Sequence, residues 1–286
     1  MRLRRFPEQV ERAAFVDPVA DGVAAVVGRA LPPGPVKDLL SGTWLGHAVH
    51  PMLTDLPIGF WTSAFVLDLV GGRTSAPAAR KLVGLGVLSA LPTAVTGLSD
   101  WADTAGGEKR VGAVHATANL VALSCYVASW KARRQGRRFR GVLLGLAGAG
   151  AATVGGYLGG HLIAAFGTGV DNTAFEGGPR DWRDAGPAPD LAAGPVAVTV
   201  DGVEVLVAAV DGDRAALSDR CTHRGGPLHE GSVERGCVTC PWHGSVFALG
   251  DGEVVRGPAT FSQPRYETRV RAGRLEVRAA PTSAAS

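Results

Sequence analysis

The chain has 286 residues, of which 46% are hydrophobic and 19% are charged, and its formal net charge is +3. This length allows one or two domains. The basic residues stand in short loops between apolar runs without interleaved aromatic side chains, so the sequence does not predict a nucleic-acid-binding protein. Four cysteines (Cys125, Cys221, Cys237 and Cys240) are too few for a disulfide framework in a chain of this length.

Residues 1–40 mix charged and apolar side chains, without the apolar core of a cleavable signal peptide, and we interpret them as an N-terminal tail. Four apolar runs follow, at about 53–72, 82–98, 111–130 and 142–166. A membrane-spanning helix needs about 20 mostly apolar residues. The second run is short, and the first contains Pro57 and Asp68, so either one alone could be a buried helix. Four in succession predict a four-helix membrane domain over residues 41–170.

The charges in the connecting loops predict the orientation of these helices. The loops after the first and third runs carry nine Lys or Arg residues and no acids: Arg73, Arg80, Lys81, Lys131, Arg133, Arg134, Arg137, Arg138 and Arg140. The two other connections are rich in Asp and Glu. The positive-inside rule places the basic loops in the cytoplasm. The C-terminal domain is then expected on the extracytoplasmic side of a bacterial cell membrane, and membrane lipid is an expected partner of the protein.

Four histidines lie near the predicted outer ends of the apolar runs: His47, His50, His115 and His161. Ionisable groups inside a membrane are functional candidates, and histidine is a common axial ligand of haem iron. One hypothesis is therefore a second metal site at His50, His115 and His161 that holds haem b. The alternative is that these histidines form hydrogen bonds with polar neighbours or lipid headgroups.

The run from His47 to Gly59 (HAVHPMLTDLPIG), with Asp68 further along, resembles a bacterial family of four-helix membrane domains of uncharacterised function. The resemblance covers roughly residues 40–170. It implies the four-helix fold and a membrane location, and it implies no activity.

The C-terminal half has the pattern of a small antiparallel β domain. Residues 171–190 are rich in Gly, Pro and Asp, which is typical of a linker. From residue 191 to 280, short alternating strands are separated by turns such as Asp201-Gly202 and Asp211-Gly212, which are strong hairpin signals. Residues 281–286 are predicted to be a C-terminal tail. The predicted fold is thus multi-domain, with a transmembrane bundle followed by a small all-β domain.

Two cysteine–histidine motifs are set into these strands, Cys221-Thr222-His223 and Cys240-Pro241-Trp242-His243. Two cysteines and two histidines can bind zinc in tetrahedral geometry. They can equally bind a [2Fe-2S] cluster, with two thiolates on one iron and two imidazoles on the other. Zinc fingers usually place both cysteines together and both histidines together, whereas here each motif supplies one of each.

The surrounding residues resemble a Rieske [2Fe-2S] domain: HRGGPL from His223, CPWHGSVF from Cys240, then Gly257-Pro258-Ala259 and Pro264-Arg265-Tyr266. The resemblance covers about residues 190–280. It implies that Cys221, His223, Cys240 and His243 are the cluster ligands, and that Gly244 and Ser245 contribute to the cluster-binding loop. Neutral imidazole ligands raise the reduction potential of such clusters.

Two departures separate the chain from the Rieske subunits that oxidise quinols. Those subunits have a further cysteine in each loop, where this chain has Gly226 and Trp242, and a tyrosine where it has Phe247. The serine corresponding to Ser245 is retained. The chain therefore looks more like the ferredoxins that supply oxygenases with electrons.

The sequence predicts a membrane-anchored electron carrier, a component of an oxidoreductase system rather than a complete enzyme. Its expected partner is a redox protein: a reductase, an oxygenase or a respiratory component. One alternative is a self-contained membrane oxidoreductase with haem or quinone bound in the helix bundle. Another is a sensor whose cluster reports the redox state.

Overall fold

The computed structural model describes residues 5–281 and divides into two compact units. The helical unit contains residues 5–32 and 49–168, and the β unit contains residues 33–48 and 169–281. The last segment of the helical unit ends at Thr168, and the β unit resumes at Gly169. The assignment of residues 33–48 to the β unit was not predicted, because nothing in their sequence indicates a distant packing partner.

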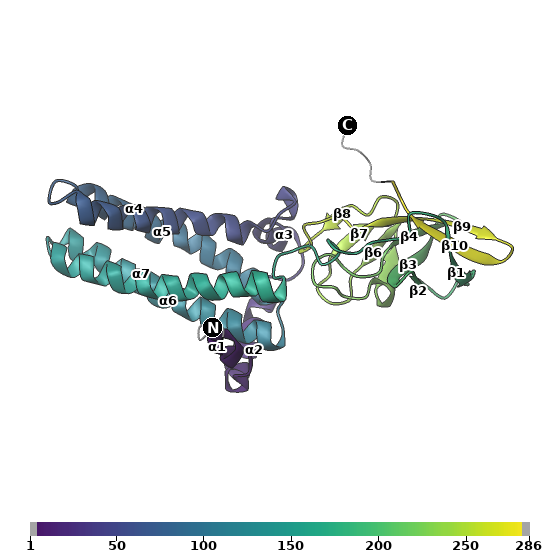
Figure 1. Ribbon diagram of the computed structural model, residues 1–286, viewed down its shortest axis with the longest axis horizontal. Helices are drawn as coiled ribbons and strands as arrows, with labels where there is room; N and C mark the ends of the chain where they lie inside the picture. Colours follow the sequence, from purple (N-terminus) through teal and green to yellow (C-terminus); the bar gives the residue numbers. More distant parts are fainter. Residues whose placement is uncertain (1–4, 282–286) are drawn as a thin grey trace. The chain divides into compact units, whose positions relative to one another are not determined.

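Four long helices form the main body of the helical unit: α4 (Val49–Val70), α5 (Ala76–Trp101), α6 (Gly106–Arg134) and α7 (Arg138–Phe166). Each is long and apolar enough to cross a membrane, which confirms the prediction of four candidate spans. Helices α5, α6 and α7 extend beyond the apolar runs, because the charged residues at their ends are also helical. Helix α4 packs along α5 and helix α6 along α7, giving two hairpins (Figure 1).

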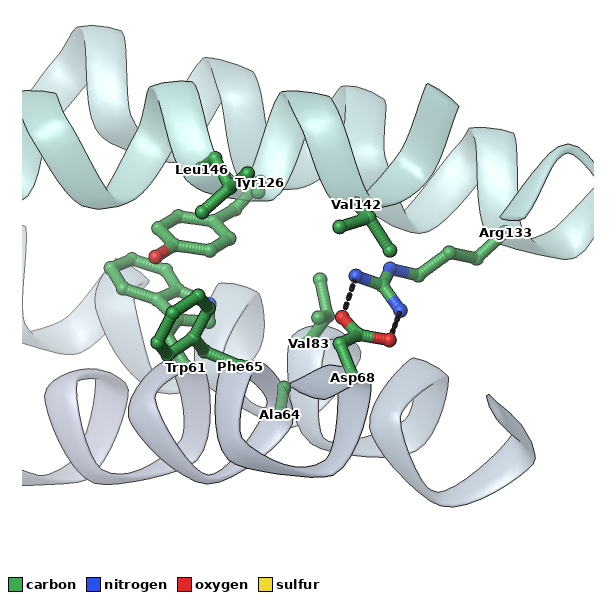
Figure 2. A pocket seen from close by; sticks show the side chains of 10 residues that line it. Trp61, Ala64, Phe65, Asp68, Val83, Tyr126, Arg133, Val142 and Leu146 are labelled. Carbon is green, nitrogen blue, oxygen red and sulfur yellow. Dashed lines mark hydrogen bonds and ion pairs between the residues drawn. The ribbon is translucent and has the colours of Figure 1, made fainter. Parts of the chain in front are cut away.

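Polar and aromatic contacts join the two hairpins. Arg133 of α6 donates hydrogen bonds to both carboxylate oxygens of Asp68 on α4, and both side chains are only 5% exposed. The rings of Trp61 and Tyr126 stack with centroids 3.9 Å apart (Figure 2). Apolar side chains gain little by leaving lipid for another apolar surface, so directional contacts of this kind contribute to helix association in a membrane.

The N-terminal segment is folded, although its sequence has the pattern of a tail. It contains α1 (Arg5–Glu11), a 3₁₀ turn η1 (Ala14–Val16) and α2 (Asp17–Ala30). Arg110 of α6 forms a two-pronged ion pair with Asp17, and Lys109 pairs with Asp21 at 2.8 Å. These long-range ion pairs attach the segment to the bundle, and the local sequence pattern could not reveal them.

The β unit contains ten strands in two antiparallel sheets. The six-stranded sheet has the order β1-β10-β9-β4-β3-β2, and the four-stranded sheet has the order β5-β6-β7-β8. The strands are β1 (Arg183–Pro187), β2 (Val196–Val200), β3 (Val203–Val210), β4 (Asp213–Ser218), β5 (Ser232–Glu234), β6 (Cys237–Thr239), β7 (Val246–Ala248), β8 (Val254–Arg256), β9 (Arg265–Arg271) and β10 (Arg274–Ala279). This confirms the predicted all-β class. The unit also includes helix α3 (Pro35–Ser41) and two 3₁₀ turns, η2 (Thr43–Leu45) and η3 (Leu228–Glu230).

The Asp-Gly turns form hairpins as predicted. Asp201 and Gly202 have φ values of 49° and 82°, and Asp211 and Gly212 have values of 50° and 90°. Two successive residues with positive φ give the tight turn whose twist matches antiparallel strands. The first turn connects β2 to β3 and the second connects β3 to β4.

The predicted linker at 171–190 is in part a strand. Residues 183–187 form β1, which pairs with β10 at the edge of the six-stranded sheet. Just before it, the Trp182 ring lies 4.3 Å from the guanidinium carbon of Arg269 and 4.6 Å from that of Arg278. Backbone pairing and cation–π contact therefore order a stretch whose Gly, Pro and Asp content is typical of loops.

Candidate functional site

The two cysteine–histidine motifs lie in two loops of the β unit. Loop 1, residues 219–231, connects β4 to β5, and loop 2, residues 240–245, connects β6 to β7. Cys221 and Cys240 are 1% and 3% exposed and pack in one core cluster with Leu228, Val238 and Phe247. The cysteine side chains of the two loops therefore meet in the interior.

Both loops close with the same hydrogen-bond pattern. In loop 1 the Gly225 N–H donates to the Cys221 carbonyl, and the Cys221 N–H donates to the Gly226 carbonyl. In loop 2 the Gly244 N–H donates to the Cys240 carbonyl, and the Cys240 N–H donates to the Ser245 carbonyl. Gly225 and Gly244 have φ values of +72° and +74°, a left-handed conformation that glycine adopts without strain. Each cysteine is thus held at the start of a tight, similarly shaped turn.

The two histidines form a second pair. The ring centroids of His223 and His243 are 5.1 Å apart, with the rings nearly perpendicular. Within residues 5–281, no three His, Cys, Asp or Glu side chains gather closely enough to hold one metal ion. The four residues therefore form a thiol pair and an imidazole pair. Two pairs suit two irons with two protein ligands each better than one tetrahedral zinc ion.

Hydrogen bonds join the two sulfurs of the thiol pair and point to both of them. The Cys221 thiol donates to the Cys240 sulfur, which lowers the pKa of Cys240 to about 7 and raises that of Cys221; burial raises the Cys221 pKa further. The backbone N–H groups of His223 and Arg224 point to one sulfur, and those of Trp242 and His243 point to the other. These donors stabilise negative charge on sulfur, as a thiolate ligand requires.

The environment favours neutral imidazole. Burial is the main cause that lowers the pKa of His223 well below its ordinary value, and the positive charges of Arg224, His243 and Lys37 lower it further. Neutral imidazole is the form that binds a metal. The buried thiols and half-buried imidazoles on the two loops therefore fit a [2Fe-2S] cluster.

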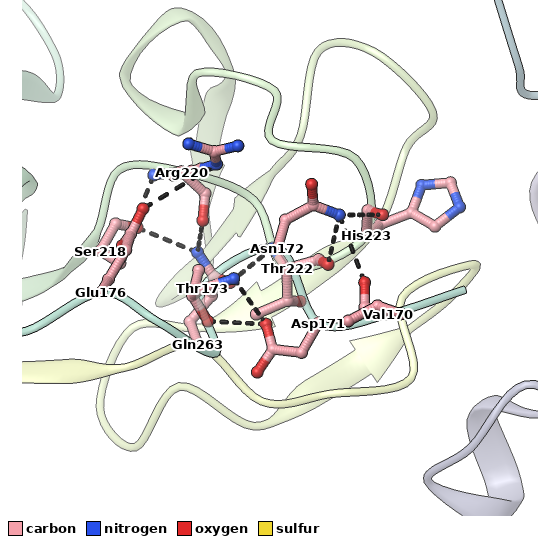
Figure 3. Close-up of polar contacts among 10 residues, drawn as sticks. All are labelled: Val170, Asp171, Asn172, Thr173, Glu176, Ser218, Arg220, Thr222, His223 and Gln263. Carbon is pink, nitrogen blue, oxygen red and sulfur yellow. Dashed lines mark hydrogen bonds and ion pairs between the residues drawn. The ribbon is translucent and has the colours of Figure 1, made fainter. Parts of the chain in front are cut away.

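Two amide side chains outside the motifs hold loop 1 (Figure 3). The Gln263 side chain, 3% exposed, accepts a hydrogen bond from the Thr222 N–H at 2.9 Å and donates to the carbonyls of Ser218 (2.9 Å) and Arg220 (3.1 Å). The Asn172 amide donates to the His223 carbonyl at 2.8 Å. The backbone around Cys221 and His223 is thus held by side chains distant in sequence.

Loop 2 is held by the segment that follows β8. The Ser245 hydroxyl oxygen, fully buried, accepts a hydrogen bond from the Ala259 N–H at 3.0 Å. At Gly226 of loop 1, an added Cβ would lie 3.0 Å from the Cys240 sulfur and 3.0 Å from the Trp242 ring. Gly226 and Trp242 therefore lie against each other, at the two positions where the quinol-oxidising type has its extra cysteines.

Residues 33–48 also contact these loops, although they precede the first long helix. Pro33 packs beside Gly244, and the Thr43 hydroxyl donates to the Ala259 carbonyl at 3.1 Å. Asp38 accepts a hydrogen bond from the Gly257 N–H, and burial raises the pKa of its carboxyl group. Lys37 of the same segment is 3% exposed, and its charge acts on His223.

Two residues near the motifs have other roles. His229 belongs to neither cysteine–histidine motif. Its Nδ1 atom lies 2.7 Å from a carboxylate oxygen of Asp219, and Asp219 is only 1% exposed. This pair braces loop 1, because the His229 N–H also donates to Asp219. Cys237 begins β6 and is partly exposed, whereas Cys221 and Cys240 are buried.

The four histidines of the N-terminal half have different neighbours in the structure. His47 belongs to the β unit, where its ring lies 5.5 Å from that of Phe261. In the helical unit, His50 and His115 face each other with ring centroids 6.4 Å apart. The Nε2 atom of His161 lies 2.8 Å from a carboxylate oxygen of Glu11 instead.

Sequence reasoning did not identify Gln263, Asn172 or Lys37. Each is a single polar residue outside any motif. Lys37 lies in a segment that carried no chemical signal, and Asn172 lies in the predicted linker. Only their burial and their contacts with the ligand loops reveal a role.

Comparisons with known proteins agree with this geometry. Residues 181–267 match the family described as Rieske [2Fe-2S] domain. Residues 46–172 match the family described as Predicted membrane protein (DUF2231).

Individual relatives are similar to about a third of the chain or less. The chain is 31% identical over 98 residues to the anthranilate 1,2-dioxygenase ferredoxin subunit of Burkholderia cepacia, covering 34% of this chain and 91% of that protein. It is 33% identical over 76 residues to apoptosis-inducing factor 3 of Mus musculus, of whose length it spans 13%. A solved structure, the ferredoxin of carbazole 1,9a-dioxygenase from Nocardioides aromaticivorans IC177, is 24% identical with a TM-score of 0.30, covering 35% of this chain and 98% of that one. The chain therefore belongs to the Rieske [2Fe-2S] family through its C-terminal domain, which is joined to a DUF2231 membrane domain.

Proposed function

We propose that this protein is a membrane-anchored electron carrier that passes single electrons to or from a redox protein partner. The [2Fe-2S] cluster would be held by Cys221 and Cys240 on one iron and by His223 and His243 on the other. The single observation that supports this most is the meeting of a buried thiol pair and a half-buried imidazole pair on two similar loops. Gly244 and Ser245 would shape the second loop around the cluster.

The partner would approach the histidine side of the cluster. Trp242, next to His243, is 56% exposed, and Pro241 is exposed as well. Exposed aromatic side chains are enriched in protein interfaces. The names of the ferredoxin relatives mention dioxygenase systems, which supports a reductase or an oxygenase as the partner here. A respiratory protein that exchanges single electrons is the other candidate partner.

The cluster assignment is tested on the full-length protein purified in detergent. We expect two irons and two acid-labile sulfides per chain, and a Rieske-type EPR signal after reduction. Cys221→Ser should abolish this signal, whereas the matched control Cys237→Ser, three residues before Cys240, should retain it. Stoichiometric zinc in protein purified under reducing conditions, or loss of the signal in the control alone, would contradict the ligand set.

The Rieske domain would lie on the extracytoplasmic side. Nine Lys or Arg residues and no acids in the two basic loops support this orientation. The exposed Thr199 on β2 and the exposed Gln135 in the loop between α6 and α7 allow a paired test in a background without Cys125 and Cys237. A membrane-impermeant thiol reagent on intact cells should label Thr199→Cys and should label Gln135→Cys only after lysis. The reverse pattern would place the domain inside.

A second candidate function is a membrane oxidoreductase whose helix bundle holds its own cofactor, haem or quinone, and exchanges electrons with the cluster. The observation that favours it is the pair of facing histidines, His50 and His115, inside the bundle. A quinone would need a pocket with hydrogen-bond donors, whereas haem needs axial ligands, and the histidine pair supplies these.

A further inference from the structure

The facing histidines of the helical unit come from different hairpins. His50 lies in the first turn of α4, and His115 lies ten residues into α6. Their ring centroids are 6.4 Å apart and their planes are inclined by 85°. Both residues are half-buried in the helical unit, and ionisable groups in membrane helices are rare and usually functional.

A backbone carbonyl of the neighbouring helix orients each ring. The Nδ1 atom of His50 lies 2.9 Å from the carbonyl oxygen of Thr93 on α5, and the Nδ1 atom of His115 lies 2.8 Å from that of Gly155 on α7. A carbonyl oxygen can only accept, so each Nδ1 carries the proton and each Nε2 has a lone pair. Histidines that bind metals are usually held in this way through the other ring nitrogen.

Glycines on the neighbouring helices leave room for the His50 and His115 rings. A Cβ atom added at Gly97 of α5 would come within 2.5 Å of the His50 ring, and one added at Gly159 of α7 would come within 3.1 Å of the His115 ring. Each imidazole therefore packs directly against a helix backbone. A hydrogen bond on one side and a glycine surface on the other fix the ring, as a preorganised ligand requires.

The side-chain amide of Asn119 does not occupy the lone pair of His115. Its nitrogen lies 3.2 Å from Nε2 and 3.4 Å from Nδ1 of that ring. Nearly equal distances to both ring nitrogens place the amide beside the ring rather than along the axis of the Nε2 lone pair. Both Nε2 atoms therefore keep an acceptor position for a ligand.

The spacing fits one metal ion between the rings. Two imidazoles on opposite sides of a metal, each with a nitrogen about 2 Å from it, have centroids roughly 6 Å apart. A bare ion would need further ligands, and in the described part of the chain no third His, Cys, Asp or Glu joins the pair. Haem iron has four ligands in its own macrocycle and needs only two from the protein.

We propose that His50 and His115 are the axial ligands of a b-type haem that links the two helix hairpins. The sequence contains no Cys-x-x-Cys-His motif for covalent attachment, so the haem would be held without a covalent bond to the protein. His161, which the sequence grouped with these two, is engaged by Glu11 and takes no part. This inference deepens the second candidate function and rests on it for a physiological role.

Haem would give the bundle a one-electron centre of its own. The Rieske cluster also changes by one electron, so a transfer between them reduces one centre and oxidises the other without a further reactant. An external partner would then supply or remove the electron at either centre.

The test uses the full-length protein purified in mild detergent from haem-replete cells, and then titrated with hemin. We expect one haem per chain in the pyridine haemochrome assay, and a low-spin spectrum typical of two imidazole ligands. His50→Ala and His115→Ala should each lose the haem and retain the Rieske EPR signal, which shows that the chain is folded. His161→Ala, the matched control, should retain both.

The conservative variant His50→Met provides a second measurement. It should retain haem with a changed spectrum and a raised midpoint potential, because a Met/His ligand pair favours the reduced iron. Protein with a full Rieske signal and no haem after hemin titration would overturn the inference and leave the proposed electron carrier intact. Haem that survives both alanine variants, or that is lost only in His161→Ala, would overturn the ligand assignment. Bound haem without a Rieske signal would instead overturn the cluster assignment.

Discussion

Gln263 offers a sharp test of how loop 1 is held, because one buried amide satisfies three backbone groups. It accepts from the Thr222 N–H and donates to the carbonyls of Ser218 and Arg220. Gln263→Leu keeps a similar volume and removes all three hydrogen bonds. Thr222 lies between Cys221 and His223 in the chain, so the damage should appear first at the cluster.

The size of the effect follows from these three contacts. Each hydrogen bond contributes about 0.5–1.5 kcal/mol net, and a buried group left without a partner costs about 1–3 kcal/mol. Because the carbonyls can recover part of this loss from water at the edge of the loop, we expect a total destabilisation of about 2–4 kcal/mol. For a domain of about 100 residues, this lowers the unfolding temperature by on the order of 10–20 °C.

The assay follows the visible absorbance of the cluster during heating of the full-length protein in detergent. Gln9→Leu, the same substitution at an exposed position of α1, is the matched control and should leave the cluster transition unchanged. Gln263→Glu keeps the acceptor for Thr222 but loses both donors, so it should also be destabilised. A transition temperature for Gln263→Leu within a few degrees of the unmodified protein would refute the role given to this residue.

Three further predictions concern charges and buried polar groups. Lys37→Gln should lower the midpoint potential of the cluster, because a positive charge near His223 favours the added electron; Lys81→Gln, at an exposed position of α5, should not change it in a redox titration. Ser245→Ala should destabilise the β unit by about 1–3 kcal/mol, because the Ala259 N–H loses its acceptor; equal thermal stability for Ser245→Ala and the exposed Ser232→Ala would contradict this. Asp68→Asn should destabilise the helical unit by about 3–5 kcal/mol, because Arg133 would remain buried without its counter-charge; the exposed Asp55→Asn on the same helix should have little effect on thermal unfolding in detergent.

Local signals in the sequence were sufficient to predict the long helices, the hairpin turns and the cysteine–histidine motifs of this protein. Apolar runs of about 20 residues predict spanning helices because burying an unpaired backbone in lipid is costly. The Asp201-Gly202 turn was predictable because a two-residue hairpin turn depends only on the conformations of its own residues. The two cysteine–histidine motifs, together with the resemblance of the residues around them to a Rieske domain, were enough to predict Cys221, His223, Cys240 and His243 as cluster ligands.

Contacts between distant segments were decided only by the tertiary structure. Asn172 and Gln263 hold a ligand loop from 50 and 41 residues away, and no periodicity or motif marks either of them. The pairing of His50 with His115, and the engagement of His161 by Glu11, depend on how four apolar helices pack and rotate about their axes. Helical periodicity is weak when nearly every face is apolar, so the sequence could place these histidines at a depth but could not choose their partners.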